Sequence, residues 1–279
     1  MLRHPLILSL SFAAVVAAPS GAQTAGTVPN LSGGWSRVGE LVETYEKIPG
    51  FTGAGPMLVD PKHPHVDGVG QPWWVASLDN PILRPETLAR LRVITEAEIE
   101  GTGHLKDEGL CLPSGVPMIL NRRGAAVQIL QSKDRVLILN ARDQQVRTVY
   151  LDVPHSNNPR PSWYGESVGH YEGGDTLVVD TIGQNDRTQI DRFGTTHSAQ
   201  LHVMERYRIS PDGRLEVQFT VEDPVAFTTP WSARVRFAAS RQPWDEEVCA
   251  ENNRFVGEVT IAGRITRDVP IPTAARPDF

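Results

Sequence analysis

From Ala125 to Phe237 the chain alternates between short runs rich in β-branched residues and brief turn signals. Apolar side chains recur at every second position in these runs, which is the period of a strand with one buried face. The runs cover residues 127–131, 135–140, 145–151, 175–182, 201–209, 215–222 and 233–237. Almost no helical spacing separates them, so consecutive strands are expected to pair. We predict a mainly β fold, a single lipocalin-like antiparallel barrel or sandwich.

Two other elements precede this region. Residues 31–36 resemble the first strand of a small barrel, entered through glycine. One short helix is predicted at about 84–101, because Pro85 suits a first helical position and Glu86 complements the positive end of a helix. Residues 49–81 contain many Gly, Pro and His residues and are expected to form a long ordered loop that covers an opening.

The first 22 residues have the pattern of a secretory signal peptide. Arg3 and His4 supply a positive start, and residues 6–18 form an apolar stretch too short to span a bilayer. Ser20 and Ala22 place small residues where a signal peptidase reads, which predicts cleavage after Ala22. A buried N-terminal strand or anchor helix is the alternative. The predicted location is the periplasm or the cell exterior.

The composition of the mature chain excludes several classes of partner. Removing residues 1–22 takes away Arg3 from the 27 basic residues, and the remaining 26 face 33 acidic residues, a net charge of −7. Such a chain repels nucleic acid and anionic lipid. No later stretch approaches the roughly 20 apolar residues of a membrane helix, so no membrane insertion is expected after cleavage. We expect a polar spacer at 23–30 and one barrel-like domain at 31–279. The sequence does not determine the oligomeric state.

The chain has two cysteines, Cys111 and Cys249. An even number in an oxidising compartment indicates one disulfide, here closing a loop of more than a hundred residues. Two unrelated buried thiols are the alternative. Neither cysteine belongs to a C-x-x-C pair or lies beside a histidine, so a zinc or redox site is not expected.

Three segments between Pro154 and Trp231 resemble a known family. Residues 163–181 read Trp-Tyr-Gly-Glu-Ser-Val-Gly-His-Tyr-Glu-Gly-Gly-Asp-Thr-Leu-Val-Val-Asp-Thr, residues 197–207 begin His-Ser-Ala-Gln-Leu-His, and residues 221–231 end Phe-Thr-Thr-Pro-Trp. They resemble a large and mostly uncharacterised family of exported bacterial proteins with the pattern G-x-S-x-G-x-[WY]-E-G-D-T-L-V-V-D-T. The resemblance covers roughly 31–255. It implies a role like that of the phenylcoumaran-type acid decarboxylases of lignin-dimer catabolism.

The chain departs from that family pattern at two places. Gly173-Gly174 is one glycine longer than the usual turn, and Gln184 replaces a common aromatic residue. The resemblance therefore implies a class of substrate and not a particular compound.

Gly165-Glu-Ser167-Val-Gly169 matches the G-x-S-x-G pattern of serine hydrolases. That nucleophile elbow needs a strand, a sharp turn and a helix, whereas Ser167 leads into another strand. A serine on a glycine-bounded strand is the simpler interpretation, and a Ser167 nucleophile remains an alternative.

Side chains on the strand at 201–209 alternate between two faces. His202 and Arg206 share one face with Met204 and Arg208. If that face points into a barrel lumen, a titratable histidine and a cation face a cavity together. If it points to solvent, Leu201, Val203 and Ile209 form the core instead, and the pattern leaves both open.

The segment at 164–172 places Tyr164, Glu166, His170 and Glu172 on one face. Inside a lumen they would form a line of acid–base groups, whereas outside they would be surface residues. A metal site is not predicted, because His197 and His202 are five residues apart and no strand face brings them together with Glu205.

The pattern favours an enzyme without a cofactor, a lyase of the decarboxylase or dehydratase type acting on a small aromatic molecule, and the resemblance implies that this molecule is a lignin-derived phenolic acid. The predicted catalytic residues are Glu166, His170, His202 and Arg206. Arg206 would bind a carboxylate, Glu166 or His170 would act as general base, and His202 would return the proton to carbon.

Trp163, Tyr164 and Trp231 are predicted to bind the substrate by stacking on its ring. A lipocalin-like protein that binds or carries a small apolar molecule is the first alternative, in which the same residues only fix orientation. A serine hydrolase that uses Ser167 is the second.

Overall fold

The computed structural model describes residues 28–38, 45–64, 74–100, 111–121, 126–242, 244 and 247–249, and the backbone of two short strands beyond them. The signal peptide predicted at 1–22 lies outside the described residues.

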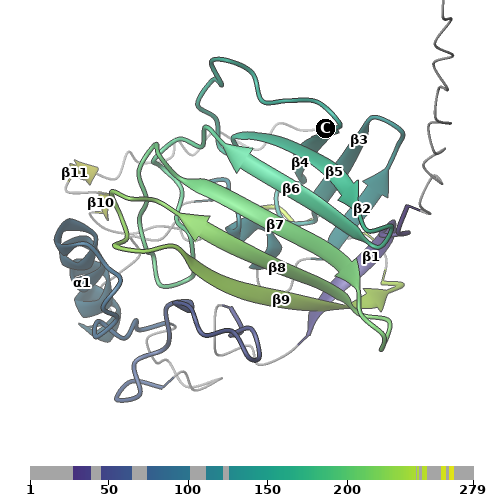
Figure 1. Ribbon diagram of the computed structural model, residues 1–279. Helices are drawn as coiled ribbons and strands as arrows, with labels where there is room; N and C mark the ends of the chain where they lie inside the picture. Colours follow the sequence, from purple (N-terminus) through teal and green to yellow (C-terminus); the bar gives the residue numbers. More distant parts are fainter. Residues whose placement is uncertain are drawn as a thin grey trace, which may run out of the picture.

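Nine strands close into one barrel and follow each other around it in chain order (Figure 1). They are β1 (Gly33–Val38), β2 (Val127–Gln131), β3 (Arg135–Asn140), β4 (Gln145–Leu151), β5 (Glu166–Glu172), β6 (Thr176–Ile182), β7 (His202–Ile209), β8 (Leu215–Glu222) and β9 (Trp231–Ser240). β9 pairs back onto β1. The prediction of a mainly β, lipocalin-like barrel is confirmed, and the sandwich alternative is excluded. β10 (Val259–Ile261) and β11 (Arg264–Thr266) form a separate two-stranded sheet.

One pair of neighbouring strands departs from the antiparallel prediction. β4 and β5 run parallel, with Val149 opposite Ser167 and Leu151 opposite Gly169. Parallel neighbours need a crossover of a dozen residues or more, and the connection at 152–165 is long enough to provide it. The barrel is therefore mixed, and this crossover crosses the outside of the sheet beside β5.

The interior of the barrel is filled by side chains, some of which come from segments outside the barrel wall. Tyr45 packs with its ring 4.8 Å from that of Phe219 and 6.2 Å from that of Trp231. Its hydroxyl donates to the carbonyl oxygen of Ile190 at 2.5 Å. Met57 and Phe193 belong to the same continuous core. The described parts of the predicted loop at 49–81 therefore pack against one end of the barrel instead of leaving it open.

The predicted helix is α1 (Pro85–Glu100), followed by the short 3-10 helix η1 (Met118–Asn121). α1 lies at one end of the barrel in Figure 1, and it buries Leu91 and Ile94. Its first turn is tied to the chain between β8 and β9, because the Arg84 backbone N–H donates to the Ala226 carbonyl oxygen at 3.0 Å. No helix in the described ranges combines the length and the apolar character needed to cross a bilayer.

The predicted disulfide between Cys111 and Cys249 is confirmed, with Cα atoms 5.5 Å apart and a sequence separation of 138. It ties the segment before η1 to the segment that follows β9. Bridging so distant positions restricts the unfolded chain strongly.

Candidate functional site

Inside the barrel, the described residues include a buried polar network. Arg147 on β4 donates to both carboxylate oxygens of Glu205 on β7, and Tyr207 also donates to Glu205, at 2.8 Å. Burial disfavours the charge of Arg147, but the adjacent Glu205 carboxylate raises the Arg147 pKa on balance. Burial likewise raises the Tyr207 pKa well above its usual value. Because these groups satisfy one another, we assign them to stability.

All four predicted catalytic residues lie on the outer face of the barrel. They are Glu166 and His170 on β5 and His202 and Arg206 on β7. Of the two orientations that the sequence leaves open for these faces, the structure has the outward one, because the alternating neighbours Ser167 on β5 and Val203 and Tyr207 on β7 are buried on the inner face. The structure nevertheless brings them to one part of the outer surface, on either side of β6.

A chain of hydrogen bonds connects two of these residues across β6. His155, on the crossover before β5, places Nδ1 3.0 Å from Glu166 Oε1 and Nε2 3.2 Å from Asp180 Oδ1. His202 places Nε2 2.8 Å from the same Asp180 oxygen and Nδ1 3.4 Å from Glu222 Oε2. We call these five residues the histidine–carboxylate chain.

Both ring nitrogens of each of these two histidines face hydrogen-bond acceptors. An ionised carboxylate only accepts hydrogen bonds, and neutral imidazole has a single N–H to donate. Each ring of His155 and His202 faces carboxylate oxygens with both nitrogens. A ring can donate both of these bonds at once only as the imidazolium, and Asp180 then accepts from two cations.

The surroundings of Glu166 favour its ionised carboxylate. Hydrogen bonds from Ser156, followed by the hydrogen bond and charge of His155, lower the Glu166 pKa from its usual value. The Ser156 backbone N–H donates to Glu166 Oε1 at 2.7 Å. Glu166 therefore stays an acceptor at neutral pH and anchors the crossover segment.

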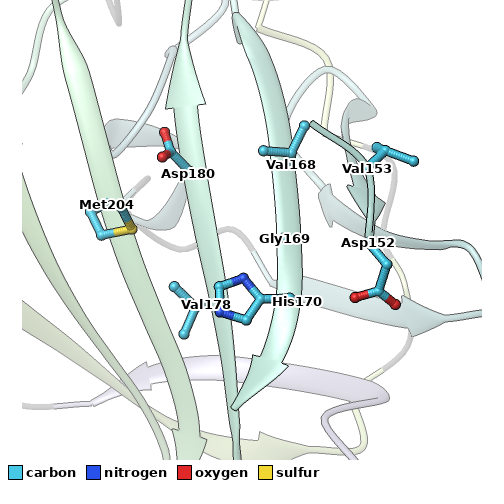
Figure 2. A pocket seen from close by; sticks show the side chains of 8 residues that line it. All are labelled: Asp152, Val153, Val168, Gly169, His170, Val178, Asp180 and Met204. Carbon is cyan, nitrogen blue, oxygen red and sulfur yellow. The ribbon is translucent and has the colours of Figure 1, made fainter. Parts of the chain in front are cut away.

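A pocket of about 210 Å³ opens beside this chain (Figure 2). It is lined by Asp152, Val153, Val168, Gly169, His170, Val178, Asp180 and Met204. Figure 2 shows the His170 ring close to Val178, with Asp180 on the neighbouring strand and Asp152 on the crossover. The walls are largely apolar, and three titratable groups stand at their edges. Such a mixture is typical of small-molecule sites.

His170, Val178 and Arg206 form one row across β5, β6 and β7. His170 pairs with Val178, and Val178 pairs with Arg206, so all three side chains point outward at the same level. Two strand spacings separate the outer members of the row, roughly 10 Å between their backbones. Within the described residues the His170 ring makes no hydrogen bond, whereas Arg206 donates to Glu172. Both Arg206 and Glu172 are about half exposed.

The three aromatic residues predicted to bind a ring do not lie together. The Trp163 ring lies 4.8 Å from the guanidinium carbon of Arg187. The Tyr164 hydroxyl donates to Gln145, and Trp231 is 1% exposed inside the barrel. None of the three lines the pocket. The predicted aromatic platform is therefore not formed around the candidate site.

Ser167 lies inside the barrel and is 2% exposed. Its hydroxyl contacts Arg147 Nε at 3.1 Å and the Thr181 hydroxyl at 2.9 Å, with β5 continuing on both sides. The flanking glycines are required by packing. A Cβ at Gly165 would stand 2.3 Å from the Ile182 carbonyl oxygen, and one at Gly169 would stand 2.8 Å from that of Val178. This geometry gives the G-x-S-x-G pattern a structural role and does not favour a hydrolase.

The structure also separates the residues that were considered for a metal site. His197 is buried against Thr188 and Ser198, Glu205 is inside the barrel, and His202 is outside. Across the described ranges, no three histidine, cysteine or acidic side chains are grouped so as to hold a metal ion.

His155 and Asp180 are the main members of the site that sequence reasoning missed. Asp180 is the one acidic side chain in the apolar run of β6, and it faces outward opposite Met204. That position is a detectable signal, since an acid inside an apolar strand run needs a partner. His155 belongs to the crossover, and nothing in its local pattern indicates which strand it contacts.

No protein-family model matches the chain, and no curated protein is significantly similar to it in sequence.

Proposed function

We propose that this protein is an exported enzyme that moves protons on a small phenolic acid in the outer-face pocket, as a lyase of the decarboxylase or dehydratase type. One observation carries the proposal. His170, whose ring makes no hydrogen bond among the described residues, shares a largely apolar pocket with a carboxylate, Asp180, that two further histidines hold. Several titratable groups converging on one pocket favour catalysis over carriage.

The row of three residues provides a way to hold such a substrate. The aromatic ring lies on Val178 with Val168 and Met204 beside it, and burial of this apolar surface supplies affinity. The phenol hydroxyl reaches His170, and the carboxylate of the substrate reaches Arg206. Arg206 gives up its hydrogen bond to Glu172 and binds the substrate carboxylate instead. This exchange costs little, because an exposed ion pair contributes about 0–1 kcal/mol.

The residues of the pocket supply both halves of a proton transfer. His170 takes the phenol proton, and electron density moves through the conjugated side chain to the carbon that carries the carboxylate. That carbon accepts a proton that the His155 and His202 imidazolium rings supply through Asp180. The bond to the carboxylate then breaks, its electron pair returns to the ring, and carbon dioxide leaves. The substrate acts as its own electron sink, so the step needs no cofactor.

The two imidazolium rings also make the pocket acceptable to an anion. Asp152 and Asp180 alone would repel a carboxylate or a phenolate. The charges of His155 and His202 offset them. Export is supported by the leader pattern of residues 1–22 and by the disulfide, which is typical of an oxidising compartment. The resemblance to the exported bacterial family points to the same class of reaction.

The test is mass spectrometry of the purified mature protein incubated with a panel of lignin-derived phenolic acids and dimers, with no cofactor added. A product lighter by carbon dioxide or by water is expected. His170→Gln should reduce kcat by about 10²- to 10⁴-fold, the usual contribution of a general acid–base group. Arg206→Lys should mainly raise KM, because lysine cannot bind a carboxylate in a bidentate manner.

Arg208→Lys is the matched control for Arg206→Lys. Arg208 lies two residues further along the same outer face and pairs with Glu216, away from the residues that line the pocket. Turnover should be unchanged in this variant. Unchanged masses for every compound, or full activity in both His170→Gln and Arg206→Lys, would overturn the proposal.

The barrel fold is also that of lipocalin-like binding proteins, so carriage is the second candidate function. A ligand inside the barrel would have to displace Tyr45 from Phe219 and Trp231. The same incubation distinguishes the two functions, because a compound that is retained at unchanged mass indicates a carrier.

A further inference from the structure

We propose that His155 is a pH-dependent latch that holds one wall of the pocket, and that it acts as a positioning residue. The proposal builds on the proposed function in treating the pocket as the site. It concerns the crossover segment between β4 and β5, which reaches the pocket through Asp152 and Val153.

The start of the crossover, residues 152–156, is attached to the barrel at three successive points. The Asp152 backbone N–H donates to the Gly169 carbonyl oxygen at 2.8 Å, and the Ser156 N–H donates to Glu166 at 2.7 Å. Both of these acceptors belong to β5. Within residues 152–156, the bond from the His155 side chain to Asp180 is the described one that reaches β6. Further along the crossover, Ser162 exchanges backbone hydrogen bonds with Gly183 and Asn185 just after β6. His155 is therefore the contact that joins β5 to β6 at the pocket edge, while Ser162 anchors the far end of the segment.

The groups around His155 come from every neighbouring element. Glu166 faces it from β5, and Asp180 faces it from β6. His202 on β7 and Glu222 on β8 act on it through Asp180. Asp152 on its own segment adds a further negative charge at the pocket edge. The surroundings are thus predominantly anionic, and they attract the segment only while the rings are charged.

Loss of the His155 proton removes one of its two bonds. Neutral imidazole donates at one nitrogen and presents a lone pair at the other, which then faces a carboxylate oxygen. One of the two attachments, to β5 or to β6, becomes repulsive. The Val153 wall then loosens, so the pocket is closed on this side while the His155 ring carries its second proton and open once that proton is lost. Histidine changes its charge between about pH 5 and 8.

Hydrogen exchange read by mass spectrometry tests the latch on the intact mature protein. Exchange of peptides from 152–165 is measured from pH 5 to 8 and corrected for the intrinsic pH dependence of the chemistry. In the wild type, protection should fall about tenfold across this range, as expected when one charge-assisted hydrogen bond is lost. His155→Gln should give low protection at every pH, and His155→Lys, which keeps its charge, should give high protection at every pH.

His170→Gln is the control, because it removes a histidine of the same pocket that makes no hydrogen bond among the described residues. It should keep the wild-type pH dependence. Protection that does not change with pH in the wild type, or that changes equally in His155→Gln, overturns the latch. The exchange measurement uses no substrate. A protein that shows the pH-dependent protection but no turnover therefore contradicts the proposed function and leaves the latch standing.

Discussion

Arg147 and Glu205 join β4 to β7 through the inside of the barrel. Two guanidinium nitrogens of Arg147 lie 3.0 and 2.5 Å from the two carboxylate oxygens of Glu205, and both side chains are almost completely buried. A buried ion pair contributes little net stability relative to a well-packed apolar pair, but removal of one partner leaves an uncompensated charge. The barrel therefore depends on the two residues being kept or lost together.

Glu205→Gln should lower the free energy of unfolding by about 3–5 kcal/mol, because it leaves the Arg147 charge buried without its counter-ion. Urea unfolding followed by tryptophan fluorescence measures the change. The double variant Arg147→Met with Glu205→Leu should recover most of the loss. A double variant less stable than Glu205→Gln would show that the ion pair itself is strongly favourable.

Replacing Cys111 and Cys249 by serine should lower stability by about 2–5 kcal/mol, since the bridge restricts a long loop in the unfolded chain. Thermal unfolding with and without a reductant measures this effect. Reductant should lower the Tm of the wild type to that of the double-serine variant and leave the variant unchanged. Equal Tm values without reductant would contradict a stabilising role.

Gly165→Ala should be more destabilising than Gly213→Ala. Both glycines have positive φ, +66° and +77°, so alanine at either position costs about 1–2 kcal/mol for its left-handed backbone. At Gly165 the new Cβ would also collide with the Ile182 carbonyl oxygen, whereas no atom lies within 4 Å of it at Gly213. Urea unfolding of the two variants compares them. Equal losses would mean that the β5 and β6 backbones separate at little cost.

His197 should make stability fall as the pH decreases below the usual histidine range. Burial lowers the His197 pKa from its usual value near 6.5, so the folded state favours the neutral ring. Its Nδ1 donates to the Ser198 carbonyl oxygen, which leaves Nε2 to accept from the Thr188 hydroxyl at 2.7 Å. The stability that the neutral His197 ring contributes is fully present above the pKa of His197 in the unfolded chain. It is lost as the pH falls towards the lower pKa of His197 in the folded state.

The measurement is urea unfolding of the wild type and of His197→Gln at a series of pH values between 5 and 7.5. The variant should lose less stability over this range than the wild type does. The two proteins losing stability in parallel would show that the pH dependence arises elsewhere.

The strands and the helix could be predicted from the sequence because their patterns are local. The runs at 127–131, 135–140 and 145–151 match β2, β3 and β4, and the helix at about 84–101 matches α1. β9 is longer than the predicted 233–237, since its ends carry alanine, serine and tryptophan rather than a β-branched pattern. The parallel pairing of β4 and β5 could not be predicted, because it depends on the path of the crossover.

The inner face of β7 could not be identified for a different physical reason. Each face carries charged or titratable residues, with Glu205 on one and His202 and Arg206 on the other. What places Glu205 inside is Arg147, 58 residues earlier, whose charge it neutralises. A single strand contains no record of that partner, so the sequence groups the predicted residues correctly on two strand faces but leaves open which face points into the barrel.

The barrel closes where β1 pairs with β9, so that Gly34 meets Ser240. β5 to β9, by contrast, form an uninterrupted series of antiparallel neighbours within residues 166–240, and β5, β6 and β7 provide the strand floor of the pocket. Pairings between neighbours in sequence form faster than pairings between distant segments. We therefore expect the floor of the pocket to form early in folding, before β1 completes the barrel wall around it.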